Sequence, residues 1–176
     1  RLRLGWLGLR YAHRLLRRGA WGELDLRTTF AHTSLRALVS PRARRPGPEI
    51  ATVAITPRCP LDCWHCSQGI RRGETLPREV LQAILDRLVE MGTSVVALTG
   101  GEPLLAPDLG PLLDRIRPPT GAMVFSSGWG LTPRIAEALT GRPNLLVLIS
   151  LDHTEAAVHD RLRGRDGAHR RALEAL

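Results

Sequence analysis

The sequence predicts an α/β fold built on a parallel β-sheet, and two observations lead to this prediction. Short apolar runs alternate with segments of helical periodicity along residues 50–176. Polar or glycine-rich residues follow each run, which is where parallel sheets place their binding sites. No apolar stretch reaches the roughly 18 residues that a membrane-spanning helix needs. With 176 residues, 43% of them hydrophobic, the chain is long enough to enclose one core.

The predicted strands are short apolar runs, several of them rich in β-branched residues and bounded by breakers. They span Ile50–Ile55, Val95–Leu98, Ala122–Phe125 and Leu145–Leu151. The first follows Ser40–Pro48, whose prolines and charged residues predict a linker. The fourth begins after Pro143 and Asn144.

Helical segments are predicted between the strands. In Pro77–Met91 the apolar residues recur at i, i+4 and i+8, with Pro77 in the first turn and Gly92 just past the end. Asp108–Ile116 is a shorter helix that Asp108 is placed to cap. The third helix, Thr132–Leu139, has Thr132 as its N-cap, and a last one begins near Gly167.

This alternation, repeated four times, implies right-handed crossovers between parallel strands. Two closures remain open: a doubly wound sheet, or the wall of a barrel that four strands cannot complete. The chain begins with Arg1 rather than Met, and it ends inside a helical run. We therefore expect a fragment of a longer polypeptide.

The positive charge is concentrated at the start of the chain. Residues 1–48 contain 11 Arg against Glu23 and Asp25, whereas residues 49–176 contain 14 Arg against 15 acids. We therefore predict a basic helical arm and linker over residues 1–48 and a core domain over residues 49–176. Nucleic-acid binding by the arm is disfavoured, because charge runs are usually solvated faces. Residues 1–19 either lie on an anionic membrane surface or pack on the domain, and we favour packing.

Three cysteines lie within eight residues, as Cys59-x3-Cys63-x2-Cys66, directly after the first predicted strand. An odd number of clustered thiols does not suit a secreted disulfide framework and favours a reducing cytoplasm. Three thiolates on a cubane of four irons leave one iron without a protein ligand, and chemistry can take place at that open iron. The alternative is a zinc ion held by the cysteines with His65 or His153. It is disfavoured because zinc sites usually contain two C-x2-C pairs, and the chain has no second pair besides Cys63-x2-Cys66. His65 also lies directly beside Cys66 and can hardly bind the same metal ion as the three cysteines.

The cysteine spacing resembles the signature of the radical S-adenosylmethionine (SAM) superfamily. Further resemblances follow the later strands in the family's order. They are Gly100-Gly101-Glu102, similar to the family's GGE motif, then Ser126-Ser127-Gly128, then Ser150-Leu151-Asp152, and finally His159-Asp160-Arg161-Leu162-Arg163-Gly164. The last run is similar to one in the branch of peptide-modifying and molybdopterin-type enzymes. The sequence departs from the family pattern at His65, where an aromatic residue is usual, and at Ser127, where Asn is usual.

The resemblance implies a partial (β/α)6 barrel similar to a TIM barrel, with four β/α units present. It implies that Cys59, Cys63 and Cys66 ligate a [4Fe–4S] cluster, with SAM as the second cofactor. In the family the GGE segment holds the amino group of SAM, and the segments after the third and fourth strands lie around the rest of it. The SAM-binding residues implied in this way are Gly100, Gly101, Glu102, Ser126, Ser150, Asp152 and Arg163.

The function implied is that of a radical SAM enzyme. The reduced cluster cleaves SAM to a 5′-deoxyadenosyl radical, which takes a hydrogen atom from a substrate. A peptide, a cofactor precursor and a lipid precursor are the candidate substrates, and a flavodoxin or ferredoxin is the expected reductant. The alternative from another class is a non-catalytic zinc or iron–sulfur module attached to a nucleic-acid-binding arm.

Overall fold

The computed structural model describes residues 47–66 and 74–176. The predicted basic arm, including the membrane or packing contact of residues 1–19, lies outside the described residues except for Gly47 and Pro48. None of the helices in residues 47–66 and 74–176 has the length and hydrophobicity that a membrane span requires.

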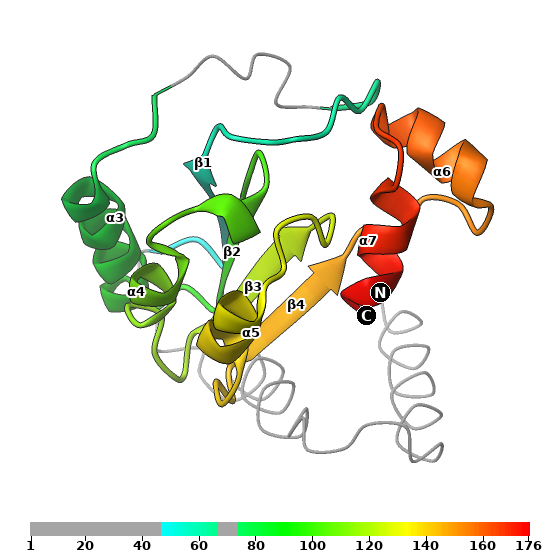
Figure 1. Ribbon diagram of the computed structural model, residues 1–176. Coiled ribbons are helices and arrows are strands. Elements are labelled where there is room, and N and C mark those ends of the chain that lie inside the picture. The colour runs from blue at the N-terminus through cyan, green and yellow to red at the C-terminus, as the bar shows by residue number, and fades with distance from the viewer. Residues whose placement is uncertain (1–46, 67–73) are drawn as a thin grey trace, which may run out of the picture.

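Four parallel strands form one sheet. They are β1 (Ile50–Thr56), β2 (Val95–Gly100), β3 (Gly121–Ser126) and β4 (Leu145–Ile149). Their order in the sheet is β1-β2-β3-β4, the same as their order along the chain (Figure 1). A doubly wound sheet reverses its strand order at a switch point, and this sheet does not. The question that the sequence left open is therefore answered in favour of a barrel wall.

The helices that connect the strands lie on one side of this sheet (Figure 1). They are α3 (Arg78–Glu90), α4 (Leu109–Leu113) and α5 (Pro133–Leu139), and a short 3-10 turn, η1 (Pro103–Leu105), precedes α4. After β4 come α6 (Ala156–Arg163) and α7 (Ala168–Glu174). Such a one-sided arrangement is the one that right-handed crossovers produce when strands are added in sequence.

The hydrophobic core lies between the sheet and these helices. Alternate strand residues point toward the helices, as the period of two in a strand requires. The fully buried members are Ile55, Val96, Leu98, Val124, Leu81, Leu85, Leu109, Leu112 and Leu113. On the opposite face, Thr52, Ala54 and Phe125 are exposed. Helix packing thus fixes the strands, and their carboxyl ends align along one edge.

Most predicted elements are confirmed, and the differences have physical reasons. The Thr132 hydroxyl accepts a hydrogen bond from the Ile135 N–H, as a cap should. Asp108 occupies the N-cap position of α4 but makes no capping bond, because its carboxylate pairs with Arg78 at 3.5 Å. β4 ends at Ile149 rather than Leu151, and α6 was not predicted.

Candidate functional site

The three cysteines lie on residues 57–66, called the cysteine loop below, which runs from the end of β1 toward α6 (Figure 1). Leu61 anchors the loop and is only 1% exposed. The Asp62 N–H donates to the Arg163 carbonyl at 2.9 Å, and Arg165 Nη1 donates to the Pro60 carbonyl at 2.7 Å. The loop is therefore held at the carboxyl edge of the sheet by the end of α6.

Gly164 allows this contact between the loop and α6. It has φ of +64°, and a Cβ at this position would overlap the Asp62 carbonyl oxygen. A residue with a side chain would be strained in this left-handed conformation and would also collide with the loop. The close approach of the cysteine loop thus explains why a glycine ends the His159–Gly164 run.

Cys59, Cys63 and Cys66 are all partly buried, and none is in a disulfide. A turn joins two of them, in which the Cys66 N–H donates to the Cys63 carbonyl at 3.1 Å. Among the described residues, no group of three His, Cys, Asp or Glu side chains surrounds a position for a single metal ion. His153 was one of two alternatives for the fourth ligand of a zinc ion. Its side chain instead accepts a hydrogen bond from the Glu155 N–H.

The donor set on the cysteine loop can be compared with what each kind of metal centre needs. Zinc holds its sulfur ligands at about 2.3 Å and so draws them onto one point. In a cubane each thiolate binds a different iron, so the sulfurs stay further apart. Three thiols on one loop are the soft donor set that iron–sulfur clusters use. The residues present therefore fit a [4Fe–4S] cluster.

Gly100 and Gly101 let β2 end tightly against the start of the cysteine loop. Gly100 has φ of +129°, and a Cβ on either glycine would overlap the backbone carbonyl of Thr56 or Arg58. In place of side chains, the two backbones are hydrogen-bonded: the Gly101 N–H donates to Thr56 and the Glu102 N–H to Arg58, each at 2.7 Å. The glycine pair thus positions the loop that carries the thiols.

The Glu102 carboxylate is 1% exposed and accepts four hydrogen bonds. Oε1 accepts from the Leu104 N–H at 3.0 Å and from Ser126 Oγ at 2.7 Å. Oε2 accepts from the Ser127 N–H at 2.8 Å and from Ser127 Oγ at 2.5 Å. A carboxylate has about four acceptor positions, so all of them are occupied. Glu102 therefore links the end of β2 to the end of β3.

The segments that follow β3 and β4 are joined in turn. Ser126 is buried, and its carbonyl accepts a hydrogen bond from the Ser150 N–H at 2.8 Å. Its hydroxyl also accepts from the Gly128 N–H at 2.9 Å. Ser127, which stands where the family usually has Asn, donates to Glu102 through both its backbone and its side chain. Ser127, although it differs from the usual Asn, thus makes a specific contact with the Glu102 carboxylate.

Asp152 and Arg163 form an ion pair beside the cysteine loop. Arg163 Nη2 donates to Asp152 Oδ1 at 2.8 Å. Arg163 Nε lies 2.7 Å from Oδ2, although its N–H does not point at that oxygen and has no hydrogen-bond partner. The third guanidinium nitrogen, Nη1, donates to Cys63 Sγ at 3.9 Å. His65 Nε2 lies 3.8 Å from the same aspartate.

His159 holds this pair from the α6 side. Its Nδ1 accepts a hydrogen bond from the Asp152 N–H at 3.2 Å, and its side chain is 1% exposed. Burial, and then the nearby Arg163 guanidinium, lower the pKa of His159 below its ordinary value. The imidazole is thus held in the neutral form, which alone can accept at Nδ1.

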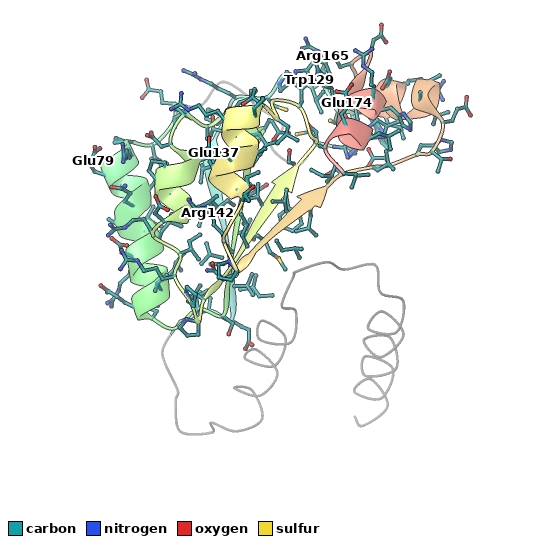
Figure 2. The ribbon with its side chains drawn as sticks, turned by 60° about the horizontal axis from the view of Figure 1, so that its bottom comes forward. Glu79, Trp129, Glu137, Arg142, Arg165 and Glu174 are labelled. Carbon is teal, nitrogen blue, oxygen red and sulfur yellow. The ribbon has the colours of Figure 1, made fainter. Side chains whose placement is uncertain are left out.

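Asp160 fixes the start of the next helix. Its two carboxylate oxygens accept from the Gly167 and His169 N–H groups, each at 2.7 Å. Burial tends to raise the pKa of Asp160, but the hydrogen bonds from these two N–H groups outweigh it and hold the pKa below its ordinary value. Beyond this turn, the Arg165 guanidinium stacks over the Trp129 ring at 4.3 Å (Figure 2).

The predicted site residues thus lie along one edge of the sheet and are connected by hydrogen bonds or ion pairs. Sequence reasoning missed that His159, Asp160 and Arg165 organise this edge. The His159–Gly164 run was the signal that pointed there, but it assigned no contact to the first two residues. For Arg165 the sequence gives no signal, because that segment is rich in arginine throughout.

A protein-family model described as the radical SAM superfamily matches residues 53–176. The AdoMet-dependent heme synthase of Methanosarcina barkeri is 30% identical over 135 residues, which cover 73% of this chain and 38% of the synthase. The PqqA peptide cyclase of Streptomyces rochei is 36% identical over 128 residues, which cover 70% of this chain and 35% of the cyclase. The chain therefore spans less than two fifths of these relatives.

Among solved structures, Streptococcus suis SuiB bound to its precursor peptide SuiA superposes with a TM-score of 0.64 at 15% identity. The match covers 93% of this chain and 40% of SuiB, and it agrees with the barrel-wall arrangement of the strands. The family model covers well over half of the chain. This chain belongs to the radical SAM superfamily, whose enzymes use a [4Fe–4S] cluster and SAM.

Proposed function

We propose that this chain holds the [4Fe–4S] cluster and the first part of the SAM site of an enzyme that modifies a peptide. One observation carries the proposal: the segments that follow all four strands are joined to one another at one edge of the sheet. The cysteine loop is bonded to the Gly100–Glu102 turn, that turn to Ser126 and Ser127, and the Arg163 segment back to the loop. A site built from several strand ends is typical of barrel enzymes.

In this proposal Cys59, Cys63 and Cys66 hold three irons of the cluster. When bound, the reduced cluster supplies the electron that splits SAM into methionine and a 5′-deoxyadenosyl radical. The Gly100–Gly101 backbone borders the amino end of SAM, and the ends of β3 and β4 border the rest. All four acceptor positions of Glu102 are taken, so we assign to it the role of fixing this turn.

A peptide is the proposed substrate class. The proposal is supported by the relatives that are named for peptides, the PqqA peptide cyclase and SuiB with its precursor peptide. Because another relative is named as a heme synthase, a cofactor precursor is the second candidate substrate class. We further propose an external one-electron donor such as flavodoxin or ferredoxin. The described residues hold no cysteine besides the three in the loop for a second cluster.

Anaerobic reconstitution with iron and sulfide tests the function. The reconstituted chain is expected to turn brown and, after reduction in the presence of SAM, to release 5′-deoxyadenosine. The Cys59→Ala, Cys63→Ala, Cys66→Ala triple variant should do neither. A colourless wild-type chain that retains one zinc ion instead would contradict the proposal.

A further inference from the structure

Arg163 contacts both a carboxylate and a cysteine sulfur in the candidate site. Its guanidinium pairs with the Asp152 carboxylate and also donates to Cys63 Sγ. Its side chain is 11% exposed and that of Asp152 is 28% exposed, so the contact with Cys63 is partly buried and the ion pair is open to water on the Asp152 side. Through this arginine a positive charge lies next to the Cys63 sulfur, and a negative charge is paired with the same guanidinium.

Both charges are held in place from several directions. The Arg163 carbonyl accepts from the Asp62 N–H, which ties the end of α6 to the cysteine loop. The Asp152 N–H donates to His159 Nδ1, which ties the loop after β4 to the same helix. Because backbone groups make these bonds, the two side chains start from fixed positions.

A charge at this position acts on a cluster in a predictable direction. Reduction adds negative charge to the cluster, and part of it resides on the thiolate sulfurs. A hydrogen-bond donor or a cation at a sulfur stabilises the reduced state and raises the reduction potential. A carboxylate beside that cation opposes the effect. The two residues of the pair therefore act on the potential with opposite signs.

We propose that the Arg163–Asp152 pair sets the reduction potential of the cluster bound at Cys59, Cys63 and Cys66. Arg163 acts through the Cys63 sulfur and raises the potential, and Asp152 lowers it. Both are positioning residues for the radical reaction. The inference rests on the proposed function, because it requires that the cluster binds at this loop.

The test is a redox titration of the reconstituted chain without SAM, followed by electron paramagnetic resonance (EPR). Arg163→Met should shift the midpoint potential to more negative values, and Asp152→Asn should shift it to more positive values. Arg163→Lys keeps the charge and should lie between Arg163→Met and wild type. Arg161→Gln is the matched control, since it removes an exposed arginine from the same helix and should leave the potential unchanged.

Opposite shifts in the two variants support the inference, provided that iron and sulfide contents match those of wild type. If Arg163→Met fails to hold a cluster, the midpoint potentials of Arg163→Lys and Asp152→Asn are compared instead, and they should shift in opposite directions from wild type. Equal potentials in all variants, or shifts of the same sign, overturn it. Weaker SAM binding by Arg163→Met at an unchanged potential would instead make Arg163 a SAM ligand. Failure of the wild-type chain to assemble a cluster refutes the proposed function, a result distinct from assembled clusters of equal potential.

Discussion

Replacing Glu102 by glutamine tests how the ends of β2 and β3 are joined. The substitution keeps the size of the side chain and changes one acceptor oxygen into an NH2 donor. That amide must face one of two pairs of donors, Leu104 N–H with Ser126 Oγ, or Ser127 N–H with Ser127 Oγ. A hydroxyl can rotate and accept, but a backbone N–H cannot. In either orientation one buried or partly buried N–H loses its partner.

The expected loss of stability follows from the one N–H group that loses its acceptor. An unsatisfied buried polar group costs about 1–3 kcal/mol, and the remaining bonds lose the strengthening that a charged acceptor gives. We expect the free energy of unfolding to fall by about 3 kcal/mol. With a urea m-value of about 2 kcal/mol/M for a domain of this size, the unfolding midpoint should fall by about 1.5 M.

Urea unfolding of the metal-free, reduced chain, followed by far-UV circular dichroism, measures this midpoint. Glu137→Gln is the matched control, because Glu137 is exposed on α5 (Figure 2) and the same chemical change there should have little effect. A Glu102→Gln midpoint within about 0.3 M of the control, at an unchanged m-value, would refute the assignment of Glu102 as the link between the two turns.

Two further predictions concern α6 and its surroundings. Gly164→Ala should unfold at a lower temperature than Gly141→Ala. Both place a side chain at positive φ, at about 1–2 kcal/mol each, but only the first collides with the Asp62 carbonyl, whereas nothing lies within 4 Å of the second. Equal melting temperatures would contradict the loop contact. The pKa of His159 is lowered, so its stabilising contribution is complete above its ordinary pKa of about 6.5 and is lost as pH falls through the lower folded value. Urea titrations between about pH 7.5 and 5 should therefore show a loss of stability that is reduced in His159→Gln, and an identical pH dependence in both proteins would exclude His159 as its source.

The elements of the sheet were predictable because their signals are local. Ile50–Ile55 and Val95–Leu98 are apolar runs bounded by breakers, and Thr132 with Pro133 is a strong helix start. Helix α6 gave no such signal, because only eight residues form it and most of them are polar or alanine. Its single fully buried residue is His159, which a periodicity argument does not count as apolar.

The sequence was enough to name candidate site residues, but it did not predict which contacts they make with one another. The glycines and Glu102 were placed by their position after a strand. That Glu102 bonds Ser126 and Ser127 follows only from β3 lying next to β2. For Arg163 the sequence offered a solvated face as readily as a site, since arginines surround it. The Arg163 side chain lies against Asp152 and Cys63 and is 11% exposed, which distinguishes it from the exposed arginines around it.

In the proposed function, three cysteines hold a cluster with one iron open to SAM. The most direct test is the EPR spectrum of the reduced, reconstituted chain, recorded before and after SAM is added. Binding of SAM at an open iron should change the spectrum, and the variant lacking all three cysteines should give no cluster signal. A wild-type spectrum that does not respond to saturating SAM would mean that the cluster is closed to SAM, and would contradict the proposed function.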